Sequence, residues 1–143
     1  MAYFQNPEVT FEVPDDWVDQ TAVVYAERGV KGIPATISLV RNSLPASGTL
    51  EARAAAVSRK LFAELPEAKI LEETRITIDA VPAVQLLVSW KHPAPEAITQ
   101  LITLFMREGT FWSFTASVPS SRIDAVDPIL QNVLVSLKIT KPR

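Results

Sequence analysis

The hairpin that decides this fold reads ITQLITLFMREGTFWSFTAS over residues 98–117. Glu108 and Gly109 suit a two-residue turn, which pairs Arg107 with Thr110 and thereby sets the register of both strands. Because side chains alternate along a strand, the register also divides them between two faces. The face predicted to be core is the bulky one, formed by Leu101, Thr103, Phe105, Trp112, Phe114 and Ala116.

The second face of this hairpin carries no charge, although the solvent face of an antiparallel sheet ordinarily does. Its residues are Ile98, Gln100, Ile102, Leu104, Met106, Phe111, Ser113, Thr115 and Ser117. Aliphatic side chains mixed with hydrogen-bonding ones suit a surface that receives an apolar helix and offers polar partners to it. A helix of the same chain would cover such a face equally well in a three-layer sandwich. The residues by themselves leave both interpretations open.

Two further strand pairs are predicted earlier in the chain. Residues 22–26 and 35–41 are predicted to be strands that flank a loop containing Gly29 and Gly32. Residues 74–79 and 83–90 form a middle hairpin. If its loop is three residues long, residues 80–82, the predicted core face combines Ile76, Ile78, Val84, Leu86, Val88 and Trp90.

Two helices are expected to pack on this sheet. Thr49 is predicted to cap a helix that continues to Glu64 and stops at Pro66, with one apolar stripe made by Leu50, Ala54, Val57, Leu61 and Leu65. Near the C-terminus, Asp127 and Pro128 are typical of a cap and first helical position. The predicted buried stripe there is Ile129, Leu130, Val133, Leu134 and Leu137. Ser120 and Ser121 also have the character of a helix cap. The expected fold class is α+β, with a twisted, mainly antiparallel sheet.

Composition bounds the class of protein. The 143 residues are 48% hydrophobic and 21% charged, which predicts a single domain over residues 1–143. A net charge of -2 gives no basic footprint for nucleic acid or anionic lipid. Cysteine is absent, which excludes disulfides, a thiol nucleophile and a lipid-modified cysteine. We find no signal-peptide pattern and no apolar run of roughly 20 residues, so a cytoplasmic protein without stable membrane insertion is expected.

Residues suited to catalysis are few. His92 is the single histidine and lies in a proline-rich stretch, where a solvated loop residue is expected. Asp15, Asp16 and Asp19 cluster but lack the glycine and distal glutamate of an EF-hand loop. Turn and capping residues beside a structural Trp17 are therefore the favoured interpretation, with a metal site as the alternative. We predict no catalytic residues, no metal and no cofactor, and we expect no enzymatic activity.

The N-terminal stretch FEVPDDWVDQT, residues 11–21, is a short strand that stops at Pro14 and turns on two aspartates into Trp17. Together with LPEAKI at 65–70 and ITIDAVPAV at 76–84, it resembles the DcrB-related, PsbP-like family over most of the chain. Ala80 departs from that pattern, because the family commonly has a turn glycine there. The resemblance implies a PsbP-like sandwich.

Short cytoplasmic members of this family resemble Eag-type chaperones of type VI secretion, which shield the transmembrane segments of PAAR-containing effectors before export. The resemblance therefore implies a homodimeric chaperone or adaptor that binds the N-terminal transmembrane helices of a PAAR or Rhs-type effector. The residues predicted to contact this client are Ala22, Val24, Leu61, Ile98, Gln100, Ile102, Leu104, Met106, Phe111 and Ser113. The alternatives are a structural or regulatory module that binds a folded partner, and a small-molecule or metal-binding domain.

Overall fold

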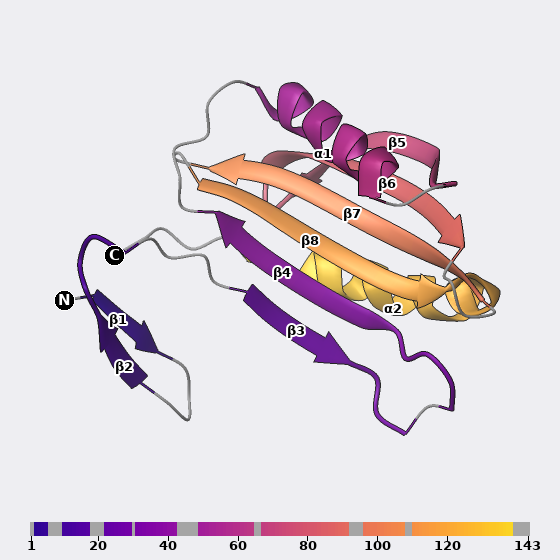
Figure 1. Ribbon diagram of the computed structural model, residues 1–143, viewed down its shortest axis with the longest axis horizontal. Coiled ribbons are helices and arrows are strands. Elements are labelled where there is room, and N and C mark those ends of the chain that lie inside the picture. Colours follow the sequence, from indigo (N-terminus) through magenta and orange to yellow (C-terminus); the bar gives the residue numbers. More distant parts are fainter. Residues whose placement is uncertain are drawn as a thin grey trace.

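The computed structural model describes residues 2–5, 10–17, 22–29, 31–42, 49–64, 67–91, 96–107 and 110–138. Its centre is a six-stranded sheet in the order β3-β4-β8-β7-β6-β5, in which every neighbouring pair is antiparallel (Figure 1). The strands are β3 (Ala22–Ala26), β4 (Thr36–Asn42), β5 (Lys69–Ile78), β6 (Val81–Lys91), β7 (Ala97–Arg107) and β8 (Thr110–Pro119). Two helices, α1 (Leu50–Glu64) and α2 (Ile123–Ser136), complete the α+β fold and confirm the predicted fold class.

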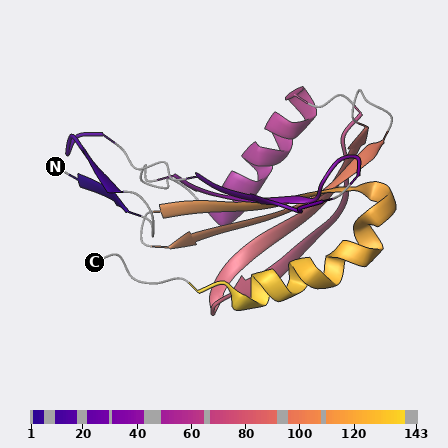
Figure 2. The same cartoon turned by 90° about the horizontal axis from the view of Figure 1, so that it is seen from below.

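The helices lie on opposite faces of the sheet, which gives three layers (Figure 2). Beneath α2, a core cluster is formed by residues such as Phe105, Phe114, Val126, Leu130 and Leu134. Beneath α1, a second cluster is formed by Ala54, Ala68, Val84, Leu86, Val88, Ile102 and Leu104. The sheet therefore has an α1 side and an α2 side, and the central part of each side is buried.

The β7–β8 hairpin has the register that its turn residues predict. Arg107 pairs with Thr110, and Phe105 pairs with Trp112. Phe105 and Trp112 stack with ring centroids 6.2 Å apart on the α2 side. The predicted bulky face of this hairpin is therefore confirmed as core.

The β5–β6 hairpin differs from the prediction by one residue. Its loop is the two-residue turn Asp79-Ala80, so Ile78 pairs with Val81 and Ile76 with Ala83. Ile76 and Ile78 consequently face α2, whereas Val84 and its alternate neighbours face α1. The predicted grouping of the two isoleucines with Val84 is wrong, because a one-residue change in register moves every side chain to the opposite face.

Helix α1 begins as predicted. The backbone N–H of Ala52 donates to Oγ1 of Thr49 at 3.1 Å, which is the contact expected of an N-cap threonine. Leu50, Ala54, Val57 and Leu61 pack into the cluster on the α1 side and confirm the apolar stripe. Leu65 and Pro66 lie outside the described residues.

Helix α2 begins earlier than predicted. Ser120–Arg122 form a short 3₁₀ helix that leads into α2 at Ile123, so Pro128 lies inside the helix and Asp127 is not its cap. Neither the 3₁₀ helix nor α2 has a side-chain hydrogen bond at its N-cap. The hydroxyl of Ser120 instead forms a hydrogen bond with that of Thr99, with the two oxygens 2.8 Å apart. Four residues of the predicted stripe, Leu130, Val133, Leu134 and Leu137, pack in the core cluster beneath α2. The fifth, Ile129, is 59% exposed. The earlier start places Val126 in the stripe in its stead.

A small separate sheet precedes the main one. It pairs β1 (Ala2–Gln5) with β2 (Thr10–Val13), and β2 confirms the predicted strand before Pro14. The backbone N–H of Trp17 donates to the carbonyl of Pro14 at 3.1 Å and closes the expected turn. Trp17 is nevertheless 66% exposed, so the predicted structural role for a buried ring is wrong.

Candidate interaction surface

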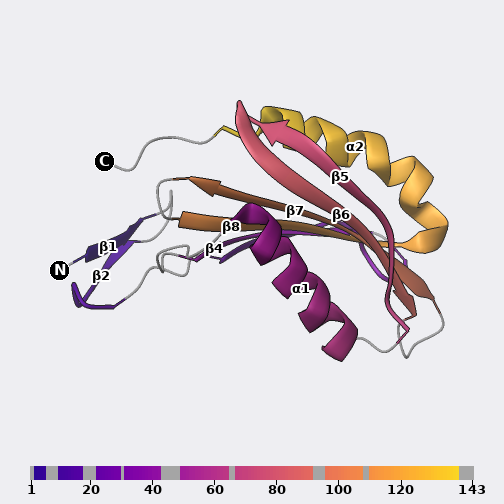
Figure 3. The same cartoon turned by 90° about the horizontal axis from the view of Figure 1, so that it is seen from above.

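The α1 side of the sheet is covered over only part of its width. Helix α1 packs on β6 and β7 (Figure 3), whereas β8, β4 and β3 lie to one side of it (Figure 1). The residues on this uncovered part are exposed or half-buried. We call this surface the open face and define it by Ala22, Val24, Ala26, Thr36, Ser38, Val40, Gln100, Ser113, Thr115 and Ser117.

The strand register orders the open face into rows that run from the sheet edge to the core beneath α1. Val24 pairs with Ser38, Ser38 with Thr115, and Thr115 with Ile102. A parallel row leads from Ala22 through Val40 and Ser113 to Leu104. Each row therefore passes from an exposed apolar residue, through hydroxyl or aliphatic side chains, to a buried aliphatic residue.

The open face combines small apolar side chains with hydrogen-bonding groups and has no charged member. Val24 is 67% exposed and Val40 is 41% exposed. Gln100 donates from Nε2 to Oγ of Ser117 at 3.0 Å, which positions its amide at the border with the buried region. Such a surface can make apolar contacts and also satisfy polar atoms of a bound segment.

The wall of this surface is helix α1. The Arg53 guanidinium of α1 lies 5.4 Å from the centre of the Phe111 ring on β8, within cation–π range. On the other flank of the helix, Glu51 forms an ion pair with Arg75 of β5. The helix is thus held against the sheet from both flanks, and its position limits the open face to β3, β4 and β8, with Gln100 of β7 at the border.

The residues predicted to contact a client divide into three groups. Ile98, Ile102 and Leu104 are 3%, 4% and 0% exposed, so they belong to the core and not to an accessible surface. Leu61 and Phe111 are half-buried against the cluster beneath α1, and Met106 is half-buried on β7. The remaining four, Ala22, Val24, Gln100 and Ser113, lie on the open face. For Ile102 and Leu104, the protein's own helix α1 provides the cover.

The predicted set omits the contribution of β4. Ser38, Val40 and Thr36 occupy the middle of the open face, between β3 and β8. Their alternation with Ile37 and Leu39 is visible in the sequence. The missing information is the pairing of β4 with β8, which lie far apart in the sequence.

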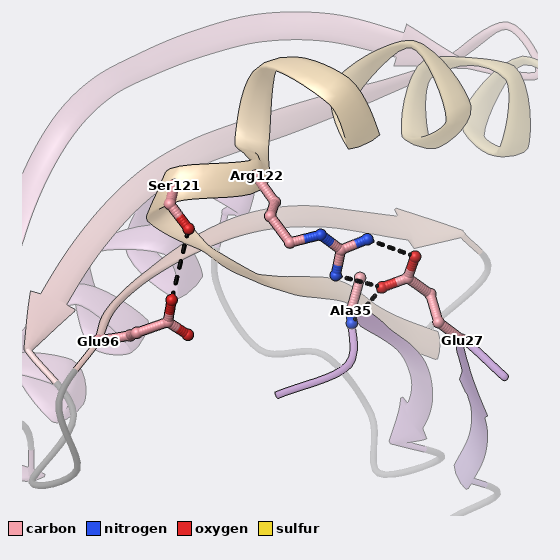
Figure 4. A network of polar contacts seen from close by, with 5 residues as sticks. All are labelled: Glu27, Ala35, Glu96, Ser121 and Arg122. Atoms are coloured by element: carbon pink, nitrogen blue, oxygen red, sulfur yellow. Dashed lines mark hydrogen bonds and ion pairs between the residues drawn. The ribbon is translucent and has the colours of Figure 1, made fainter. Parts of the chain in front are cut away.

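A charged contact fixes the end of β3 next to this surface. Arg122 donates from both terminal nitrogens to Glu27, with each distance 2.7 Å, and the backbone N–H of Ala35 donates to the same carboxylate at 2.7 Å (Figure 4). These hydrogen bonds lower the pKa of Glu27 to about 2, and the bond from Arg122 has a larger effect than the bond from Ala35. The Glu27 carboxylate likewise raises the pKa of Arg122. The contact ties the loop after β3 to the start of α2.

The remaining candidate residues are the aspartates near Trp17 and the single histidine. Asp15 and Asp16 lie in an exposed turn, whereas Asp19 and His92 fall outside the described residues. Within the described ranges, no three His, Cys, Asp or Glu side chains form a group that could hold a metal ion. Across those same ranges, no helix combines the length and the apolar character needed to cross a bilayer.

Comparison with known proteins identifies the fold and a family. The family model of DcrB matches residues 8–136. The search of curated proteins found no match. Among solved structures, PA94 from Pseudomonas aeruginosa, a protein of unknown function and candidate regulator, aligns with a TM-score of 0.82 at 17% identity, covering 100% of this chain and 99% of that one.

Two further solved structures share the architecture more distantly. The cyanobacterial PsbP protein CyanoP from Synechocystis has a TM-score of 0.56 at 11% identity, with 97% of this chain and 92% of that chain covered. LpqN, involved in cell envelope biogenesis of Mycobacterium tuberculosis, has a TM-score of 0.60 at 17% identity, with coverages of 92% and 82%. At these identities the similarities show a shared fold.

Proposed function

This chain belongs to the DcrB family, and on that premise we propose that it is a protein-binding chaperone or adaptor whose open face receives an apolar helix. The client we propose is the N-terminal transmembrane segment of a PAAR or Rhs-type effector of type VI secretion. The observation that carries the proposal is the uncharged, uncovered half of a sheet face whose other half already holds a helix.

The width of the open face suits one helix. Adjacent strands lie about 4.8 Å apart, so three uncovered strands present a strip roughly 10 to 14 Å wide. An α-helix with its side chains is about 10 to 12 Å across. A client helix would therefore lie beside α1 on the same sheet, at the ordinary helix-to-helix spacing of about 8 to 10 Å.

The side chains also match the needs of a transmembrane segment outside lipid. A helix of roughly 20 apolar residues aggregates in water unless its surface is covered. Val24, Val40 and Ala22 offer apolar contact, and the hydroxyls of Ser38 and Thr115 can bond to polar atoms exposed where the client has small residues. A charged surface would be unsuitable, because an unpaired charge buried against an apolar helix is strongly unfavourable.

The proposal includes three further statements about the working protein. It acts in the cytoplasm, where the effector is held before export. It acts as a homodimer, so that two open faces share one client region. It has no catalytic activity, because its task is to cover a surface and not to change a bond.

The test is co-purification of the chain with the N-terminal transmembrane segment of a PAAR effector. Thr115→Asp places a carboxylate in the middle of the open face and should remove most of the captured segment. Thr77→Asp is the matched control, because Thr77 is exposed on the same side of the sheet but on β5, beyond α1. Thermal melting of both variants should stay within a few degrees of the wild type.

The outcomes separate the hypotheses. Equal capture by wild type and Thr115→Asp, with both folded, would refute the open face as the client site. If Thr115→Asp fails to fold, Val40→Asp at a 41% exposed position repeats the test. Capture of a folded partner domain, with no dependence on the transmembrane segment, would favour the structural or regulatory module instead.

A further inference from the structure

Strand β3 forms one edge of the six-stranded sheet and, among the described residues, pairs only with β4 (Figure 1). An edge strand presents unpaired backbone N–H and C=O groups that another strand can bind. Proteins usually protect such an edge with lysine, proline or a bulge. The sequence of β3 is Ala-Val-Val-Tyr-Ala, its pairing with β4 is regular, and all five residues are exposed.

The sequence of β3 is also nearly symmetrical about Val24. If a second copy pairs antiparallel with a two-fold axis at Val24, Ala22 lies opposite Ala26 and Val23 lies opposite Tyr25 of the other copy. A β-branched residue opposite an aromatic one is a favourable cross-strand pair. The strand is therefore complementary to itself, as a two-fold interface requires.

An apolar hollow beside β3 supports the same pairing. On the α2 side, Val23, Tyr25, Ile37, Leu39, Phe114 and Leu137 are among the residues that line a hollow of about 190 Å³. Tyr25 itself is 67% exposed in the single chain. In the symmetric pair, Tyr25 of the second copy lies next to Val23 and so at the rim of this hollow. The added ring would cover apolar surface that the single chain leaves open.

We propose that two copies of this chain pair antiparallel through their β3 edges, with Val24 at the two-fold axis. Because the axis is perpendicular to the sheet, both α1 helices lie on the same side of the resulting twelve-stranded sheet. The two open faces then join into one uncharged cradle, with an α1 helix as the wall at each end. The use of this cradle to hold a client helix rests on the proposed function, whereas the pairing of the two β3 strands does not.

Sedimentation of the protein alone, at tens of micromolar, tests the pairing. We expect a dimer for the wild type and a monomer for Val24→Lys, because the substitution places two ammonium groups next to each other at the axis. Val135→Lys is the matched control, since Val135 is 78% exposed on α2, and it should remain a dimer. A monomeric wild type, or a Val24→Lys variant that stays dimeric, would overturn the proposal.

Oxidative cross-linking tests the register, because the natural chain has no cysteine. Directly opposite residues have the Cα separation of about 4.4 to 6.8 Å that a disulfide needs. Val24→Cys should therefore cross-link to itself. Ala22→Cys should cross-link only when mixed with Ala26→Cys, and self-linking of Ala22→Cys would refute this register.

The same variants distinguish this inference from the proposed function. If the wild type is monomeric and Val24→Cys links only to a cysteine in the co-purified effector segment, the edge belongs to the client. The β3 pairing and the homodimer would then be wrong, whereas client binding by a single chain would stand. If the dimer forms but no effector segment is captured, the pairing stands and the proposed function fails.

Discussion

Replacing Ala80 by glycine should stabilise this protein, although the exchange removes a side chain. Asp79 and Ala80 form the two-residue turn between β5 and β6, with φ angles of 49° and 65°. Positive φ at both central residues is the requirement of a type I′ hairpin turn, for which Asp-Gly is a preferred pair. Aspartate tolerates this region, but the Cβ of Ala80 collides with its own backbone there.

The expected gain is the difference between two effects. The left-handed conformation costs a residue with a Cβ roughly 1 to 2 kcal/mol, and glycine avoids that cost. Glycine in turn adds about 0.4 to 1 kcal/mol of conformational freedom to the unfolded chain. The net increase in the free energy of unfolding should be about 0.5 to 1 kcal/mol, or about 2 to 4 °C in Tm for a domain of this size.

Urea denaturation of wild type, Ala80→Gly and Ala56→Gly provides the measurement and its control. Ala56 is exposed in the middle of α1, so glycine there should lower the free energy of unfolding by about 1 kcal/mol. Opposite signs for the two variants support the turn. If both lose about the same stability, Ala80 does not have a positive φ in the folded protein, and the two-residue turn with its register is wrong.

Three further predictions concern the core, the Glu27 contact and the cap of α1. Leu104→Ala should lower the free energy of unfolding by roughly 2 to 5 kcal/mol, because Leu104 is fully buried beneath α1. Val24→Ala, at a 67% exposed position, should cost less than about 0.5 kcal/mol in the same urea titration, and equal losses would contradict the assigned burial. The lowered pKa of Glu27, about 2 against 4.5, means that its ionised form stabilises the fold above pH 4.5 and that this contribution disappears as pH falls towards 2. Melting between these pH values should show a smaller pH dependence for Glu27→Gln than for the wild type, and identical profiles would refute the contact. Thr49→Ala should cost about 1 kcal/mol through loss of its bond to the Ala52 N–H, whereas Thr49→Ser should restore most of it.

The sequence was sufficient wherever a short segment determines its own geometry. Glu108 and Gly109 predict the register of β7 and β8, and the observed pairing of Arg107 with Thr110 confirms that register. The faces of that hairpin follow directly, because side chains alternate along each strand. Thr49 identifies the start of α1 for the same reason, since a cap bond spans only three residues.

The β5–β6 register could not be settled in the same way. ITIDAVPAV fits either a two-residue or a three-residue loop, and alanine at position 80 does not signal the positive φ that the shorter loop needs. The difference is one residue, yet it decides whether Ile76 and Ile78 face α1 or α2. Packing against the two helices selects the register that buries these isoleucines with Phe105 on the α2 side.

By itself the sequence determined that one face of the β7–β8 hairpin carries no charge, because composition and alternation are local properties. Only the tertiary structure decided how that face is divided. Helix α1 packs over Ile102 and Leu104, while the pairing of β8 with β4 and β3 extends the uncovered part through Ser38 to Val24. The packing of α1 on the sheet and the pairing of β4 with β8 both join residues far apart in the chain. Their energies depend on the side chains that each fold brings into contact. No local pattern therefore specifies which half of an apolar face the protein covers and which half it leaves open.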